Sequence, residues 1–420
     1  MKVLLKRPTI VDPSSAFHLL QKDILIVDGK ITSIESDISI ETDIQIIHSD
    51  NLHVSSGWTD IFADFSDPGY EFRETLSTGA AAAKAGGFTS VFIIPNLKPI
   101  ADECAVIEHL SIRSKNLGVN ILPLGAITKN AEGNELAEMY DLASGGAVAF
   151  SDGKNSIQKP GIFLKALQYL TAINKIAIVV PYQKEMEAHG LMNEGVWSTR
   201  LGLPGMPAIA EEIAVARDIE IAKYTGGSVH FTGISSAKSL EHIVAAKQQG
   251  LKITCSVSPF HLLYCDEDLG TYDTNLKLRN PLRTKNDLEK LRIGFASGDI
   301  DCLASHHFPQ LNDHKDCEFE YAKKGAISLQ TVYSSLNKLF TTERMVDALS
   351  TKPSNIFGMK KPAIELGSEA DLTFFDPSVP FTFSKENNKS KSFNSPLLGI
   401  TFTGKVVGTF HNNTLHLNEN

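Results

Sequence analysis

Short apolar runs alternate with longer helical patterns through the middle of the chain. The pattern of Trp58 to Asp64 predicts a short buried strand, and a Pro68-Gly69 turn follows it. Glu74 to Ala85 has the pattern of a helix, and a second apolar strand starts at Phe88. A strand, a helix and a strand of these lengths predict one βαβ unit of a parallel sheet. Since the chemistry of parallel α/β folds lies at the carboxyl ends of strands, the end of this first strand is the first place to search for a site.

The same alternation continues over about 250 residues, which is the length of a (β/α)8 barrel. Candidate strands start near Trp58, Phe88, Val119, Ala147, Ile176, Ser228, Leu251 and Asp301. The stretch from Pro207 to Lys223 predicts a helix, with a proline in its first turn and a Gly226-Gly227 stop. A doubly wound open sheet is the competing architecture, but no GxGxxG motif follows any of these strands.

Both ends of the chain have the pattern of β structure. Asp28-Gly29 lies between two β-branched runs, which is a strong hairpin signal, and a second hairpin is expected around Asn412-Asn413. We therefore predict an α/β fold in which residues 53–364 form a TIM-like barrel. Residues 1–52 plus 365–420 are expected to form a small composite β-sandwich domain.

Charge, apolar runs and cysteine content argue against nucleic-acid-binding, membrane-spanning and disulfide-rich classes of protein. The 420 residues have a formal net charge of −9, which argues against nucleic acid or an anionic membrane as a partner. The longest apolar runs are too short for a membrane span, and the first residues lack the pattern of a signal peptide. The five cysteines include no CxxC pair, so neither a disulfide framework nor a thiolate zinc site is indicated. A cytoplasmic homodimer is the expectation.

Four segments of the chain form a distinctive series: Gly79 to Val91 continuing to Pro95-Asn96, Leu201 to Pro207, Asn280 to Arg283, and Gly367 to Leu372. In this order they resemble dihydroorotases of the multifunctional-complex type within the amidohydrolase superfamily. The resemblance implies a metal-dependent hydrolase barrel that interconverts carbamoyl-aspartate and dihydroorotate in pyrimidine biosynthesis. In such an enzyme the metal acidifies water and polarises the carbonyl, and a carboxylate moves protons.

The resemblance also implies six metal-binding positions, and most of them are changed. The family has His-x-His on the first strand, Asp on the fourth, His on the fifth and sixth, and Asp on the eighth. This chain has Phe62, Asp64, Asp152, Pro181, Gly233 and His306 at those places. Only Asp152 is kept, and the side chains of Phe62, Pro181 and Gly233 cannot be ligands. The family's substrate-binding side is altered as well: Asn96 remains, whereas Ser66, Arg279 and Gln310 replace an Arg, an Asn and a His.

The remaining polar residues allow two interpretations each. Asp152 is either a relic ligand or a turn residue. Asp64, Asp152 and His306 are expected in the same barrel mouth, where they either hold one Zn²⁺ or Mn²⁺ or form a hydrogen-bonded polar cluster. Lys154, beside Asp152, is either a catalytic residue or a solvated surface lysine, and we expect the second. His230 is expected to be a satisfied core histidine. Neighbouring positions on a strand point to opposite faces, so His306 and His307 are not expected to act as joint ligands.

We therefore expect a degenerate-site dihydroorotase homologue that is not catalytic and needs no metal. Its expected role is to scaffold or regulate aspartate carbamoyltransferase or an active dihydroorotase. The alternative is an active cyclic amidohydrolase with a remodelled single-metal site on Asp64, Asp152 and His306. A third possibility is a small-molecule sensor that uses the old pocket.

Overall fold

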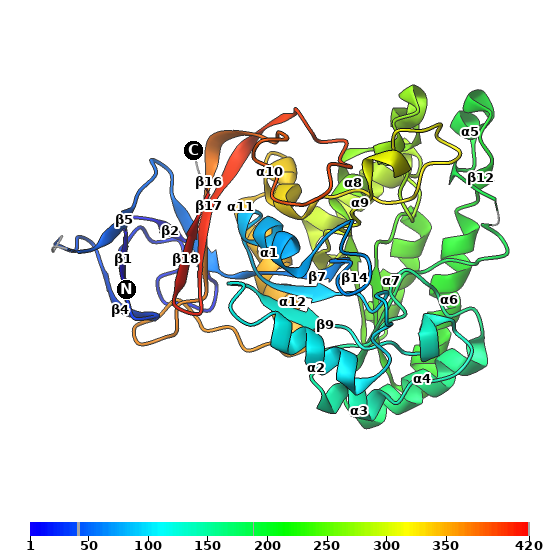
Figure 1. The fold of residues 1–420 in the computed structure, drawn as a ribbon, viewed down its shortest axis with the longest axis horizontal. Helices are drawn as coiled ribbons and strands as arrows, with labels where there is room; N and C mark the ends of the chain where they lie inside the picture. Colours follow the sequence, from blue (N-terminus) through cyan, green and yellow to red (C-terminus); the bar gives the residue numbers. More distant parts are fainter. Residues whose placement is uncertain (40–42, 188, 419–420) are drawn as a thin grey trace.

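A ring of parallel strands forms the centre of the computed structural model, which describes residues 1–39, 43–187 and 189–418. One parallel sheet has the order β7-β8-β9 and a second has the order β10-β13-β14-β15. Their bounds are β7 Trp58–Ala63, β8 Phe88–Ile93, β9 Asn120–Pro123, β10 Ile176–Val179, β13 Ser228–Thr232, β14 Ile253–Val257 and β15 Cys302–Leu303. These strands begin within two residues of the starts predicted from the sequence. The strands run from the side of the terminal sheets toward the opposite face (Figure 1).

Two sets of contacts join these sheets to each other. Phe150 forms parallel bridges to Gly125 and to Ala177, which places the fourth predicted strand between β9 and β10. At the other seam, Ala63 forms a parallel bridge to His307. The buried Asp60 carboxylate accepts hydrogen bonds from the Ser305 backbone and hydroxyl at 2.6 and 2.7 Å. The segment that starts near Ala147 pairs with its neighbours through these isolated bridges, so it does not form a regular strand.

Helices cover the outside of the ring (Figure 1). They are α1 Leu76–Ala85, α2 Cys104–Arg113, α3 Met139–Ser144, α4 Pro160–Ala172, α5 Val196–Leu201, α6 Ile209–Thr225, α7 Ala237–Gln248, α8 Pro259–Leu263, α9 Lys285–Ser297, α10 Val332–Leu336, α11 Thr342–Val346 and α12 Lys352–Phe357. The predicted helices over 74–85 and 207–223 are confirmed as α1 and α6, each shifted by two residues at its start. In the described part of the chain, none of the helices has both the length and the apolar character to cross a bilayer.

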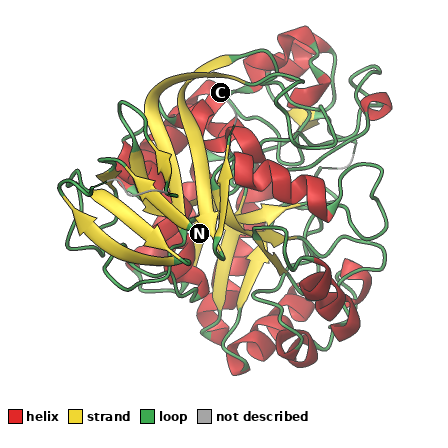
Figure 2. Cartoon of the chain, turned by 60° about the vertical axis from the view of Figure 1, so that its left-hand side comes forward, coloured by secondary structure: helices red, strands yellow, loops and turns green. Residues whose placement is uncertain are grey.

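Strands from both ends of the chain share one sheet (Figure 2). Its order is β18-β17-β16-β6-β2, with β2 Thr9–Ile10, β6 His53–Ser56, β16 Leu372–Thr382, β17 Thr401–His411 and β18 Thr414–Leu417. A four-stranded sheet lies beside it in the order β4-β3-β1-β5, with β1 Lys2–Leu5, β3 Asp23–Val27, β4 Lys30–Glu35 and β5 Gln45–Ile47. Both predicted hairpins, β3–β4 and β17–β18, are present. A further two-stranded pair, β11 Met192–Asn193 and β12 Gly205–Met206, lies at the opposite end of the molecule.

Trp58 anchors the terminal sheet to the barrel. Its ring is fully buried and lies 5.1 Å from the ring of Tyr333 on α10 and 5.4 Å from that of Phe375 on β16. The Trp58 backbone N–H donates to the hydroxyl of Thr373, also on β16, at 3.3 Å. The first barrel strand therefore starts in a cluster that includes residues from the C-terminal sheet. This cluster fixes the direction of the strand and so the position of its carboxyl end.

Candidate functional site at the barrel mouth

Apolar packing fills the position where the family's first metal ligand would be. The Phe62 side chain at the end of β7 is fully buried, with its ring 4.9 Å from the His306 ring and 6.1 Å from the Phe308 ring. An aromatic ring offers no lone pair to a metal ion. Pro181, which follows β10, is also buried and has no side-chain donor atom. Buried side chains without metal-binding atoms thus occupy both positions.

Asp64 is buried and paired with cations of the protein itself. Its carboxylate forms an ion pair with the Lys154 ammonium, and Arg73 lies 3.9 Å away. The Ser66 backbone N–H donates to the same carboxylate at 2.8 Å. Burial opposes ionisation of Asp64, but Lys154 and Arg73 outweigh it and hold the pKa of this carboxyl below its ordinary value. The negative charge that could attract a metal ion is thus already neutralised.

Lys154 corrects one expectation from the sequence. It is not a solvated surface lysine, because its side chain is only 30% exposed and its ammonium contacts buried Asp64. The local backbone explains its direction. The Asn96 amide donates to the Asp152 carbonyl at 3.1 Å and accepts from the Lys154 N–H at 2.8 Å, across the left-handed residue Gly153. Asn96, predicted as a weak substrate-binding residue, uses both ends of its amide to hold this turn.

The Asp152 side chain is hydrogen-bonded to the loop that follows β9. Its carboxylate accepts hydrogen bonds from the backbone N–H groups of Ile127 and Thr128 at 3.0 and 2.9 Å, and from the Thr128 hydroxyl at 2.5 Å. Burial raises the pKa of this carboxyl to about 6, although the Thr128 hydrogen bonds act in the opposite direction. Of the two interpretations of Asp152, this geometry supports the structural one.

His306 occupies the space above Gly233. A methyl group added at Gly233 would lie 2.5 Å from Cε1 of the imidazole, so the small residue makes room for the ring. The His306 Nε2 atom is hydrogen-bonded to the Thr232 hydroxyl at 2.9 Å. Burial, with a smaller effect from His261, lowers the pKa of His306 to about 3, so the ring is neutral at physiological pH.

The expected cluster of Asp64, Asp152 and His306 does not form. Each of the three bonds to different partners, because Lys154, the Ile127–Thr128 backbone and Thr232 already satisfy their polar atoms. Within the ranges 1–39, 43–187 and 189–418, no three His, Cys, Asp or Glu side chains are grouped so that they could hold a metal ion. The residues present therefore do not fit the metal site that the resemblance implies.

Two further histidines, His230 and His307, are buried near the site. His230 is buried and hydrogen-bonded to the hydroxyls of Thr254 and Ser256 at 2.8 and 3.0 Å, which makes it a satisfied core histidine. His307 points away from His306 and contacts buried Glu74 at 3.3 Å. Glu74 also accepts hydrogen bonds from Ser390 and from the Lys391 backbone. Sequence reasoning missed this link, because its members are far apart along the chain.

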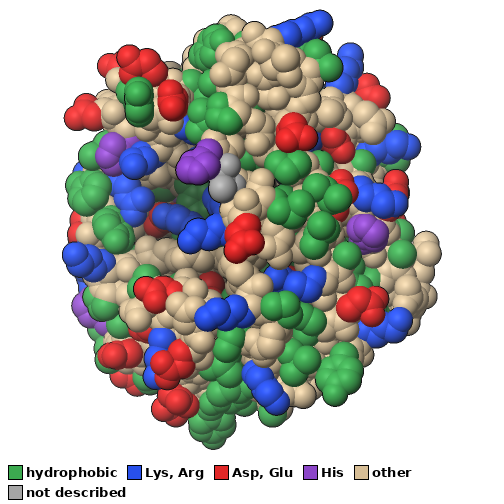
Figure 3. All heavy atoms as spheres, turned by 90° about the vertical axis from the view of Figure 1, so that its right-hand side faces the viewer, with side chains coloured by type: hydrophobic (Ala, Val, Ile, Leu, Met, Phe, Trp, Pro, Cys, Tyr) green, Lys and Arg blue, Asp and Glu red, His purple; other side chains and the backbone are tan. Residues whose placement is uncertain are grey.

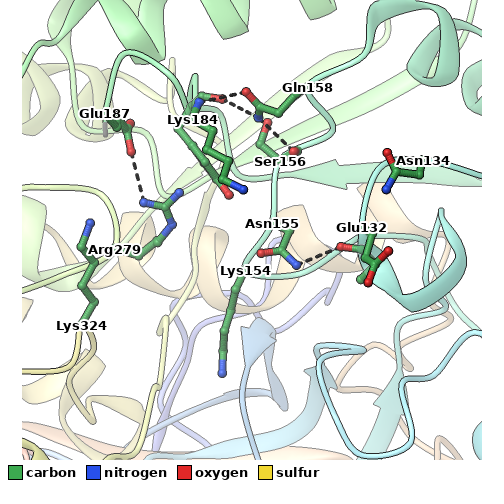
Figure 4. Close-up of a pocket in the computed structure, with 12 residues that line it drawn as sticks. Glu132, Asn134, Lys154, Asn155, Ser156, Gln158, Lys184, Glu187, Arg279 and Lys324 are labelled. Atoms are coloured by element: carbon green, nitrogen blue, oxygen red, sulfur yellow. Dashed lines mark hydrogen bonds and ion pairs between the residues drawn. The ribbon is translucent and has the colours of Figure 1, made fainter. Parts of the chain in front are cut away.

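A pocket of about 800 Å³ opens at the barrel mouth, and Lys154 is one of the residues that line it. Figure 3 faces the end of the molecule toward which the barrel strands run, and it shows a hollow with lysine and arginine side chains around it. The charged residues that line the pocket are Lys154, Lys184, Arg279, Lys324, Glu132 and Glu187. Arg279 and Lys324 lie side by side on one wall, across from Glu132 and Asn134 (Figure 4). Of these residues, the sequence analysis singled out Lys154, beside Asp152, and Arg279, as the replacement of the family's Asn.

Comparisons with known proteins agree with the resemblance. A family model described as dihydro-orotase-like matches residues 54–239. A dihydroorotase of Pelotomaculum thermopropionicum is 38% identical over 410 residues, covering 96% of both chains. One of Carboxydothermus hydrogenoformans is 37% identical and covers 98% of this chain and 97% of the relative.

Solved structures support the fold. An L-hydantoinase (dihydropyrimidinase) from Arthrobacter aurescens superposes with a TM-score of 0.86 at 21% identity, covering 98% of this chain and 95% of the other. A D-hydantoinase (dihydropyrimidinase) from Thermus sp. gives 0.83 at 19% identity, covering 99% and 95%. Full-length identity above one third, together with the matching model, shows that this chain belongs to the dihydroorotase-like family.

Proposed function

We propose that this chain is a dihydroorotase-family protein of pyrimidine biosynthesis that does not itself open the dihydroorotate ring. One observation supports this most directly: Asp64, Asp152 and His306 are each engaged by other groups of the protein. Without ligands there is no metal to activate water, and that activation is worth several kcal/mol of the barrier. The sequence has kept the scaffold while the polar atoms of the old site have become structural.

The proposed role is to scaffold or regulate an enzyme of the same pathway in the cytoplasm. Aspartate carbamoyltransferase or an active dihydroorotase is the proposed partner, and the proposed assembly contains a homodimer of this chain. The division into a barrel of residues 53–364 and a β-sandwich domain of residues 1–52 plus 365–420 belongs to the same proposal, with one correction: β6 His53–Ser56 pairs with β16, so these four residues lie in the terminal sheet. Co-purification with the transferase, and a change in its activity on mixing, is the expected result. No complex and no effect would contradict the partner.

A second candidate is an active dihydroorotase with a rebuilt single-metal site. The full-length relatives at 37 and 38% identity are named dihydroorotases, and this favours catalysis more than it favours a scaffold. In this candidate Asp64, Asp152 and His306 would exchange their present partners for one zinc or manganese ion, which would acidify water.

Metal analysis together with a ring-opening assay separates the two candidates. The chain is purified without chelators or added metal, and then assayed with dihydroorotate and with carbamoyl-aspartate. We expect less than stoichiometric metal and no turnover, both as purified and after incubation with zinc or manganese. One bound ion per chain, with turnover that Asp152→Asn abolishes, would establish the second candidate instead. Glu241→Gln, which changes an exposed carboxylate on α7, is the matched control.

A further inference from the structure

The pocket at the barrel mouth is positively charged within an acidic protein. Four basic and two acidic side chains line it, whereas the whole chain has a formal net charge of −9. The hollow is therefore a local exception to the charge of the molecule. Such a concentration of one sign in a recess raises the local concentration of ligands of the opposite sign. Its volume of about 800 Å³ is within the range of small-molecule sites.

Arg279 is held in a fixed orientation on one wall. Its guanidinium lies 3.5 Å from the centre of the Tyr182 ring and donates to Glu187 at 3.1 Å. These contacts order the side chain before any ligand arrives, which reduces the entropy lost on binding. A guanidinium has five N–H donors in a planar fork, and the bond to Glu187 uses one of them. The others can serve a bound anion.

Lys324 stands next to Arg279, and in the described part of the chain no acidic side chain forms an ion pair with it. Among the described residues, its ammonium bonds only to the sulfur of Met206, at 3.6 Å. Burial, followed by the charge of Arg279, lowers the pKa of Lys324 to about 8. The two cations thus repel each other across a half-buried space. A third basic group, the ammonium of Lys184, has no hydrogen-bonding partner in the part of the chain that the structure describes.

Two cations that repel each other favour a ligand that carries two negative charges on one chemical group. A phosphoryl group has this property, since its charge at neutral pH approaches −2 and its oxygens can accept bonds from a guanidinium and an ammonium together. A carboxylate brings one charge to one place, and a dicarboxylate separates its two. Amide and hydroxyl groups of Gln158, Asn155 and Ser156 line the rest of the pocket and can bind a polar remainder.

We propose that this pocket binds a small metabolite through its phosphoryl group, with Arg279 and Lys324 as the principal anchors. Lys154 contributes positive charge but is committed to Asp64. This inference does not depend on whether the chain hydrolyses dihydroorotate. A negative ring-opening assay would leave it unchanged, and a failure to bind phosphate would leave the proposed function unchanged.

Calorimetric titration of the full chain tests the site. Inorganic phosphate and pyrophosphate are the probes, succinate is the dicarboxylate comparison, and sodium chloride keeps the ionic strength constant. We expect saturable binding of phosphate and pyrophosphate, and at least tenfold weaker binding of succinate. Succinate binding as tight as that of phosphate, or no binding of either phosphate probe, would overturn the proposal.

Variants locate the binding to this pocket. Lys324→Met and Arg279→Gln are each expected to weaken phosphate binding about tenfold, since each removes one charged donor. Lys323→Met, at the exposed neighbouring position, is the matched control and should bind as the native chain does. If Arg279→Gln disturbs folding by leaving Glu187 unpaired, Lys324→Met decides alone. Phosphate binding by Lys324→Met at native affinity would place the anion elsewhere.

The pH dependence of binding gives a second measurement. Arg279, Glu187 and Lys277 are the charged groups that act on Lys324. Phosphate binding should weaken as the pH rises above about 8, where Lys324 loses its proton. In Lys324→Met this dependence should vanish. An unchanged dependence in the variant would contradict the role of Lys324.

Discussion

At the scale of single residues, the barrel mouth shows how a charged group can be buried when the protein itself supplies the counter-ions. Asp64 occupies a position where the family has a metal-binding histidine, and it is neutralised by Lys154 and Arg73. A buried carboxylate without a partner is strongly unfavourable, so the lysine and the aspartate are expected to depend on each other. The ion pair is therefore expected to contribute to the free energy of unfolding.

Replacing Lys154 tests this dependence. Lys154→Met leaves Asp64 with only the more distant Arg73, and we expect the free energy of unfolding to fall by about 1–3 kcal/mol. Adding Asp64→Asn to Lys154→Met should recover part of the loss, because the buried charge is then gone. Urea unfolding of the two single variants and the double variant measures the coupling. Simple additivity of the two substitutions would contradict the pairing.

The buried histidines make stability sensitive to acid. Burial, followed by the charges of Lys247 and His306, lowers the pKa of His230 from 6.5 to about 3. Below pH 6.5 the unfolded chain takes up a proton that the folded chain does not, so stability falls with pH, by about 2 kcal/mol at pH 5 for this residue. His230→Gln should reduce the stability difference between pH 7 and pH 5 by that amount. His109→Gln, at an exposed position on α2, should not.

At the scale of elements, the strand ends were the least predictable part of the structure. Largely apolar runs such as Phe88–Ile93 identified the barrel strands, because burial on both faces leaves few polar positions. The direction of polar side chains after each strand depends on backbone conformation and distant partners. The contact of Lys154 with Asp64 joins residues 90 positions apart, and nothing local to Lys154 indicates it. The sequence showed which residues stand at the positions where the resemblance implies ligands, whereas it did not show the partners of the polar ones among them.

The end of β13 provides a test at this scale. Gly233 has a φ of +68°, and a side chain there would collide with His306. Gly233→Ala should lower the free energy of unfolding by about 2–3 kcal/mol, from both the collision and the left-handed backbone. In a His306→Ser background the collision disappears, and the cost should fall to about 1 kcal/mol. Thermal unfolding of the four chains shows whether the two positions are coupled. An equal cost in both backgrounds would mean that His306 does not restrict Gly233.

At the scale of the whole molecule, the terminal sheet and the barrel share a core. Two neighbouring residues of β16 face different clusters: Phe374 packs with residues of the N-terminal strands, and Phe375 packs with Trp58 and Tyr333 of the barrel. A sheet that contributes side chains to both cores should not unfold separately from the barrel.

Substitution of these two phenylalanines measures that coupling. Phe374→Ala and Phe375→Ala should each lower the free energy of one common unfolding transition by about 3–5 kcal/mol. Calorimetry and near-ultraviolet circular dichroism, followed on the same samples, should give coincident transitions. Two transitions, one sensitive to each variant, would show that the sheet and the barrel are thermodynamically independent.

The seam between the first and last barrel strands has a consequence for biosynthesis. Asp60 and Ser305 are separated by 245 positions, so the outer edge of β7 has no neighbour until most of the chain has left the ribosome. An apolar strand with an open edge is a template for association with other nascent chains. Production of this protein should therefore depend on translation speed and on chaperones that shield β7.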